Sequence, residues 1–106
     1  MIKIQSINEL KSAKIPIELF TFLMKKIEII LEEYGLSDIG DVFSVIVLTK
    51  NEIDYLSDKY LEFNEVITIG DTSWIHTVWA ASDGYSEDIY IPCNDTNIAA
   101  IEKRCL

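Results

Sequence analysis

Residues 65–91 read EVITIGDTSWIHTVWAASDGYSEDIYI, and this stretch decides the fold. It contains three runs rich in β-branched and aromatic residues, separated by Gly70-Asp71-Thr72-Ser73 and by Ser82-Asp83-Gly84-Tyr85. Gly and Asp favour tight turns between paired strands. The pattern therefore predicts an antiparallel meander. The expected strands are 65–69, 73–81 and 88–91.

Side chains alternate between the two faces of the middle strand of this meander. Trp74 and His76 share one face with Val78 and Ala80, whereas Trp79 lies on the opposite face with Ile75 and Thr77. We expect at least one of the two tryptophans to pack in the core. Tyr85 is the better candidate for exposure because it lies at a hairpin tip.

Helices and one further strand are expected around the meander. Residues 16–34 have apolar side chains at helical spacing between Pro16 and Gly35, which suit the start and the end of a helix. Residues 41–49, DVFSVIVLT, predict a central strand buried on both faces. Capping boxes at Ser6 and Thr49 predict two shorter helices, the second continuing through Tyr60. A last helix should start at Asn94 or Asp95 and run through Ile98, Ile101 and Cys105.

These elements predict one α+β domain spanning residues 1–106. We expect an antiparallel sheet of about four strands, packed against a long N-terminal helix, a short middle helix and a C-terminal helix. The chain has 106 residues, of which 49% are apolar. This is enough for a single core. Neither a membrane span nor a signal peptide is recognisable, so we expect a cytoplasmic protein.

Negative charge is concentrated in the second half of the chain. Residues 51–102 contain eleven acidic residues and a single basic one, Lys59, whereas the acids and bases of residues 1–50 nearly cancel. Such a surface attracts cationic partners and repels nucleic acid. Solubility alone is the alternative explanation, although it does not require the charge to be segregated.

We predict that a partner binds the acidic residues of the middle helix and the meander, together with nearby aromatic side chains. Carboxylates spaced along a surface imitate the charges of a phosphate backbone. The alternative is an ordinary solvated face. The predicted partner-binding residues are Glu52, Asp54, Asp58, Glu62, Glu65, Asp71, Trp74, Trp79, Asp83, Tyr85, Glu87 and Asp88.

Other kinds of site find little support in the sequence. His76 is the only histidine and belongs to no catalytic spacing motif, so we expect a half-buried structural residue and no catalytic residue. The acids match no calcium loop, and one histidine with Cys93 and Cys105 does not make an ordinary zinc site. The four glycines are isolated and form no phosphate-binding loop. We expect neither a metal nor a cofactor.

In size, acidity and aromatic content the chain resembles the small cytoplasmic immunity proteins of bacterial toxin systems, of the contact-dependent inhibition and nuclease bacteriocin types. The resemblance lies in overall character and carries no functional residue over. It implies a protein that forms a one-to-one complex with a cationic toxin domain, most readily a nuclease, and so neutralises it. The acidic stretch with Trp74, Trp79 and Tyr85 would be the binding surface.

Three alternatives remain open from the sequence. A phage-encoded inhibitor or nucleic-acid mimic of the anti-CRISPR type would use the same electrostatics. A small enzyme would use two carboxylates with His76. A structural subunit would self-associate through an exposed apolar patch or a strand edge.

Overall fold

The computed structural model describes residues 1–40 and 43–104, which form five strands, three α-helices and one 3-10 helix. Asp41, Val42, Cys105 and Leu106 lie outside the described residues, so the start of the predicted strand 41–49 and the predicted helix end at Cys105 do too. In chain order the elements are β1 (Ile2–Ile4), α1 (Ile7–Ser12), α2 (Ile17–Tyr34), β2 (Val45–Val47), the 3-10 helix η1 (Lys50–Leu56), β3 (Tyr60–Ile69), β4 (Thr72–Ala80), β5 (Ser86–Pro92) and α3 (Asp95–Arg104).

The sheet is mixed, which corrects the expected antiparallel sheet of about four strands. Its order is β1-β2-β5-β4-β3, and all neighbours are antiparallel except β2 and β5, which are parallel. Val45–Val47 of β2 are all buried. A strand buried in this way needs a neighbour on each side, and β1 and β5 fill those two places.

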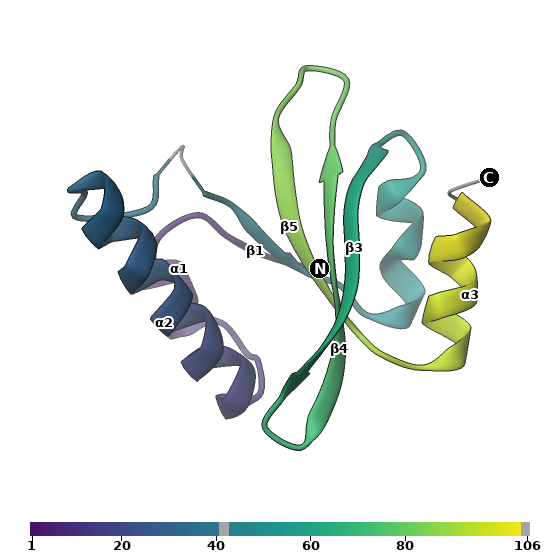
Figure 1. The fold of residues 1–106 in the computed structure, drawn as a ribbon, viewed down its shortest axis with the longest axis horizontal. Helices are drawn as coiled ribbons and strands as arrows, with labels where there is room; N and C mark the ends of the chain where they lie inside the picture. The colour runs from purple at the N-terminus through teal and green to yellow at the C-terminus, as the bar shows by residue number, and fades with distance from the viewer. Residues whose placement is uncertain (41–42, 105–106) are drawn as a thin grey trace.

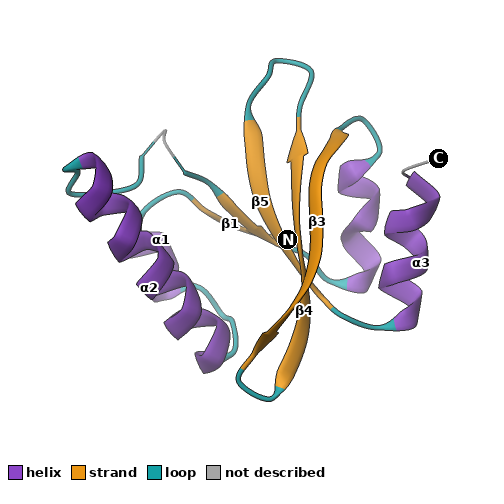
Figure 2. Cartoon of the chain, viewed as in Figure 1, coloured by secondary structure: helices purple, strands orange, loops and turns teal. Residues whose placement is uncertain are grey.

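Helices cover both faces of the sheet, as Figures 1 and 2 show. The sequence had predicted helices packed against one sheet, but not which face each helix covers. On one side, Leu19 and Leu23 of α2 belong to a core with Trp74 and Tyr90. On the other side, η1 and α3 pack against a second core that contains Trp79. The sheet therefore lies between two apolar cores, and neither of its faces is left bare as a whole.

The meander is confirmed, with β3 longer than expected. Gly70 has a φ of 61°, a left-handed conformation that glycine adopts without strain, and Ile69 pairs with Thr72 across the two-residue turn. β3 begins at Tyr60, which the sequence had placed at the end of the short helix. The helical spacing of Tyr60 was misleading because η1 ends at Leu56 and the chain turns before β3 begins.

The predicted cap of the first short helix at Ser6 and the predicted end of the long helix at Gly35 are confirmed, whereas Pro16 is the N-cap of α2 and not its first helical residue. The Ser6 hydroxyl accepts a hydrogen bond of 3.1 Å from the Glu9 amide, and Gly35 ends α2 with a φ of 65°. The apolar stripe of α2 is narrower than expected, because Ile29 is 57% exposed. Among the described residues, no helix combines the length and the apolar character that crossing a bilayer requires.

Candidate partner-binding surface

β3 forms one edge of the sheet and is exposed along most of its length. Side chains from Tyr60 to Val66 and that of Thr68 are exposed, and only Ile69 is buried. Within the described part of the chain, no strand pairs with the outer side of β3. Figure 1 shows this edge between the two helical layers, with neither layer extending over it. A long open edge of this kind can pair with a further strand.

The exposed side chains of β3 mix large apolar groups with carboxylates. Tyr60 is 68% exposed, Phe63 46% and Val66 60%. Glu62 and Glu65 alternate with them along the strand. We call Tyr60, Leu61, Glu62, Phe63, Glu65 and Val66 the β3 edge surface. Apolar and aromatic groups with a polar surround are typical of protein-binding sites.

The β4–β5 hairpin adjoins the start of the β3 edge surface. The Ser86 hydroxyl donates a hydrogen bond to the Glu62 carboxylate, which links β5 to the beginning of β3. Tyr85 at the hairpin tip is 70% exposed, as the sequence suggested. The Asp83 carboxylate accepts a hydrogen bond of 3.1 Å from the Tyr85 amide and so shapes the tip. Asp83 and Tyr85 therefore extend the acidic and aromatic surface beyond β3.

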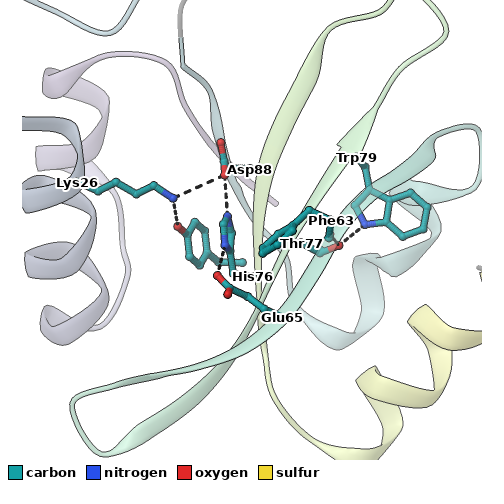
Figure 3. Close-up of polar contacts among 8 residues, drawn as sticks. Lys26, Phe63, Glu65, His76, Thr77, Trp79 and Asp88 are labelled. Carbon is teal, nitrogen blue, oxygen red and sulfur yellow. Dashed lines mark hydrogen bonds and ion pairs between the residues drawn. The ribbon is translucent and has the colours of Figure 1, made fainter. Parts of the chain in front are cut away.

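Behind the edge, His76 is held between two carboxylates. Its Nδ1 lies 2.9 Å from Glu65 Oε1, and its Nε2 lies 2.7 Å from Asp88 Oδ1 (Figure 3). The three residues come from β3, β4 and β5, and the His76 side chain is only 9% exposed. Both ring nitrogens have a carboxylate partner, and His76 is buried where the sequence had suggested a half-buried residue.

Lys26 of α2 and Tyr90 of β5 complete this network. Lys26 Nζ lies 3.2 Å from the Tyr90 hydroxyl and 3.8 Å from Asp88 Oδ1. The Tyr90 ring is stacked on the His76 ring, with centroids 4.8 Å apart. These contacts join α2 to the centre of the sheet through polar groups, beside the apolar core.

The network shifts the pKa of two of its members. Burial opposes protonation of His76, but the hydrogen bonds that the imidazole makes to the Asp88 and Glu65 carboxylates outweigh it, and the pKa of His76 is raised above its usual value. Burial, with the nearby charges of Asp88 and Glu65, raises the pKa of the Tyr90 hydroxyl. Tyr90 therefore stays protonated and neutral at physiological pH.

A second polar cluster lies on the η1 side of the sheet. The Tyr55 hydroxyl donates a hydrogen bond of 2.6 Å to Glu87, and Lys3 Nζ lies 3.6 Å from the same carboxylate. Lys59 Nζ lies 4.4 Å from the centroid of the Tyr55 ring. Burial and the Glu87 carboxylate raise the pKa of Tyr55. These residues line an open groove of about 520 Å³ that reaches Tyr85.

Trp74 and Trp79 do not belong to the binding surface, which corrects their assignment from the sequence. Trp74 is 5% exposed and Trp79 is 1% exposed, on opposite faces of β4. Because helices cover both faces, each indole packs in its own core. The Trp79 indole N–H donates a hydrogen bond of 2.6 Å to the Thr77 hydroxyl, so its polar group is satisfied inside the protein.

The predicted acidic residues do not form one continuous surface. Glu87 and Asp88 are adjacent in β5 but point to opposite faces, since Glu87 bonds to Tyr55 and Asp88 to His76. Glu52 caps η1 and pairs with the N-terminal amine of Met1. These three carboxylates therefore have partners within the fold and lie outside the β3 edge surface.

The remaining predicted acids are exposed but dispersed. Asp54 lies on η1, and the side chain of Asp58, just after it, is 83% exposed and lies 3.7 Å from Lys59 Nζ. Asp71 lies in the β3–β4 turn, at the opposite end of β3 from Glu62. From the predicted set, the structure thus leaves Glu62 and Glu65 on β3, and Asp83 and Tyr85 at the tip of the β4–β5 hairpin that adjoins the start of β3.

The described residues offer little for catalysis or metal binding. Neither nitrogen of His76 is available to a substrate while Glu65 and Asp88 hold them. No group of three His, Cys, Asp or Glu side chains in residues 1–40 and 43–104 is arranged to hold a metal ion.

Sequence reasoning missed the network around His76. The turn at Gly70-Asp71 would have indicated it, because a two-residue turn there places Glu65 opposite His76. The contribution of Lys26 has no local signal, because it depends on where α2 crosses the sheet. No protein-family model, no curated protein and no solved structure shows a significant match to this chain.

Proposed function

We propose that this protein is a cytoplasmic immunity protein that binds a cationic toxin domain, most readily a nuclease, and neutralises it in a one-to-one complex. The observation that carries the proposal is the β3 edge surface, an open strand edge on which exposed apolar side chains alternate with carboxylates. Such a surface suits a stable protein partner of opposite charge.

The part of the chain that carries this surface has almost only negative charges. From Tyr60 to Glu102 the chain has eight acidic residues and no Lys or Arg. The preceding base, Lys59, lies against the Tyr55 ring and beside Asp58. An uncompensated negative field raises the rate at which a basic protein is encountered.

A nuclease is the favoured partner because its substrate is a polyanion. A domain that binds a phosphate backbone presents Lys and Arg in its cleft. The carboxylates of Glu62, Glu65 and Asp83 can occupy such a cleft or its rim, and Phe63 and Tyr85 supply the apolar contacts that slow dissociation.

A pair of charge-reversal variants tests this proposal. The partner to use is a basic nuclease toxin domain, and its affinity is measured by calorimetry at about 50 mM and about 500 mM salt. Replacing Glu62 and Asp83 together by Lys should weaken binding by about a hundredfold and flatten its salt dependence.

Glu32 and Glu33, both exposed near the end of α2, provide the matched control because their replacement by Lys changes the net charge equally. Equal loss in both double variants would show that only net charge matters, and would argue against this surface. Undiminished binding by the Glu62/Asp83 variant would refute it. Inhibition of the toxin's nuclease activity should saturate at one equivalent of the native protein.

Glu87 and Asp88 are unsuitable for this test. Reversing either one would break the contacts with Tyr55 and Lys3, or with His76 and Lys26. A weakened complex would then report a damaged fold.

A further inference from the structure

We infer that the partner adds an extended segment to the sheet as a further strand beside β3, and that Lys or Arg alternate with apolar residues in this segment. The positive charge that we expect of this segment is taken from the proposed function. That the segment binds as a strand is inferred from the direction of the backbone groups of β3 and from the side chains on its two faces.

The register shows which backbone groups of β3 point outward. The Ser73 carbonyl accepts a hydrogen bond of 3.0 Å from the Cys93 amide and so faces β5. Backbone groups alternate in direction along an antiparallel ladder, so Thr68, the register partner of Ser73, directs its own N–H and C=O away from β4. The same alternation directs the backbone groups of Val66 and Asn64 outward.

A second contact agrees with this assignment. The Phe63 carbonyl accepts a hydrogen bond of 2.9 Å from the Thr77 hydroxyl of β4, so the backbone of Phe63 faces inward. Asn64, Val66 and Thr68 therefore offer three outward N–H groups and three outward carbonyls along the edge. That length suits a strand of ordinary size.

The two sides of the edge differ in chemistry. On the α2 side, Phe63 and Glu65 follow one another, opposite Val78 and His76 of β4. The Glu65 side chain is 42% exposed. A Lys or Arg of an added strand would meet the Glu65 carboxylate and the face of the Phe63 ring, both of which attract cations.

On the η1 side the edge carries no charge, and it combines the apolar Leu61 and Val66 with the polar Asn64 and Thr68. Leu61 and Val66 are paired with Trp79 and Ile75 of β4, and both are exposed. Side chains of an added strand alternate between the two sides, so basic residues facing Glu65 place the intervening residues against Val66. Apolar residues fit there, and an alternating basic and apolar strand matches both sides at once.

Charge argues against a second copy of this chain at the same edge. A copy would bring its own Glu62 and Glu65 to the joined strands, and each chain carries a net charge of −9. Like charges on neighbouring strands destabilise a sheet. The complementary occupant is therefore a cationic segment.

A model peptide tests strand addition without knowledge of the toxin. The probe is a peptide of about nine residues that alternates Lys and Val, added to the isotope-labelled full chain. Hydrogen exchange measured by NMR should slow at the amides of Asn64, Val66 and Thr68. The amides of Glu65 and Ile67, which already face β4, should change little.

Two control peptides make the result specific. A Lys and Val peptide N-methylated at alternate residues cannot complete the ladder, and it should bind about tenfold or more weakly. A Glu and Val peptide should not bind. Equal binding of the methylated peptide, or protection confined to the 83–85 tip, would overturn the inference. Protection that grows with protein concentration alone would assign the edge to a second copy and also overturn it.

The same exchange measurement on the complex with the toxin domain separates this inference from the proposed function. Binding of the toxin without slower exchange at Asn64, Val66 and Thr68 would refute strand addition and leave the proposed function standing. Slower exchange with the Lys and Val peptide, but no affinity for any cationic toxin, would support the edge as a strand-addition site and refute the immunity function.

Discussion

Glu65 of β3 and His76 of β4 lie directly opposite each other, and Glu65 Oε1 is 2.9 Å from His76 Nδ1. Glu65 thus belongs both to the exposed edge of the sheet and to the buried network behind it. A charge placed against Glu65 from outside is one residue away from the only histidine of the chain. The edge and the interior are electrostatically linked through this pair.

Stability should decrease as pH rises through the pKa of His76. The native pKa lies above the unfolded value of about 6.5, so the native state binds more protons between the two values. The stabilisation is complete below about pH 6.5 and is lost above the native pKa. Denaturant unfolding at intervals from about pH 6 to about pH 8.5 measures it.

The His76→Gln variant isolates this effect, because it removes the only histidine of the chain. The groups facing His76 are Glu65 on β3, Asp88 and Tyr90 on β5, and Lys26 on α2. The variant should be less stable at low pH and should show a shallower decrease. Identical slopes in the two proteins would contradict the assignment.

Replacing Lys26 by Met should raise the pKa of His76 further. The Lys26 ammonium opposes protonation of the imidazole, so its removal favours the charged ring. NMR titration of the His76 ring protons gives this pKa from a single signal, since the chain has one histidine. The neighbouring Lys25 is exposed, and Lys25→Met is the charge-matched control. An equal shift in both variants would show that the pKa of His76 depends on the net charge of the protein and not on the position of Lys26.

The hydroxyl of Thr77 should contribute more to the free energy of unfolding than its small size suggests. This side chain is fully buried, donates to the Phe63 carbonyl and accepts from the Trp79 indole. Thr77→Val keeps the shape but leaves the Trp79 N–H without this acceptor, which should lower the free energy of unfolding by about 1–3 kcal/mol. Thr77→Ser keeps the hydroxyl and should lose less. Greater stability of the Val variant would refute the role of the hydroxyl.

Gly70 should tolerate a side chain less well than Gly84. Both have positive φ, but a Cβ on Gly70 would lie 2.8 Å from Glu18 Cγ of α2, whereas the space beside Gly84 is open. Gly70→Ala should therefore cost about 1 kcal/mol more in unfolding free energy than Gly84→Ala. In a Glu18→Ala background the difference should largely disappear. A persistent difference would place the strain elsewhere in the turn.

Local patterns predicted the helix ends and the meander well, because caps and turns are determined by neighbouring residues. Even the Glu65–His76 pair follows from counting outward from Gly70-Asp71. The same alternation could have separated Glu87 from Asp88, since adjacent residues of a strand face opposite sides. The prediction placed both on one surface because both are acidic, and it did not consider that adjacent side chains of a strand point to opposite faces.

The parallel pairing of β2 with β5 could not be predicted in this way. It pairs Val45 with Asp88 and Val47 with Tyr90, and no local sequence feature of either segment identifies the other as its partner. The burial of both tryptophans has the same origin. Alternation placed them on opposite faces, but only the tertiary arrangement puts α2 over Trp74 and η1 with α3 over Trp79.

The parallel pairing also sets an order for folding of the nascent chain. The β3–β4–β5 meander closes through contacts that are short in sequence, whereas Val45–Val47 must wait until residues 88–90 have been synthesised. Long-range pairing is slow because a large loop closes before any contact forms. We therefore expect the β3–β4–β5 meander to pair before β2 does, and β5 then offers the edge along which β2 completes the sheet.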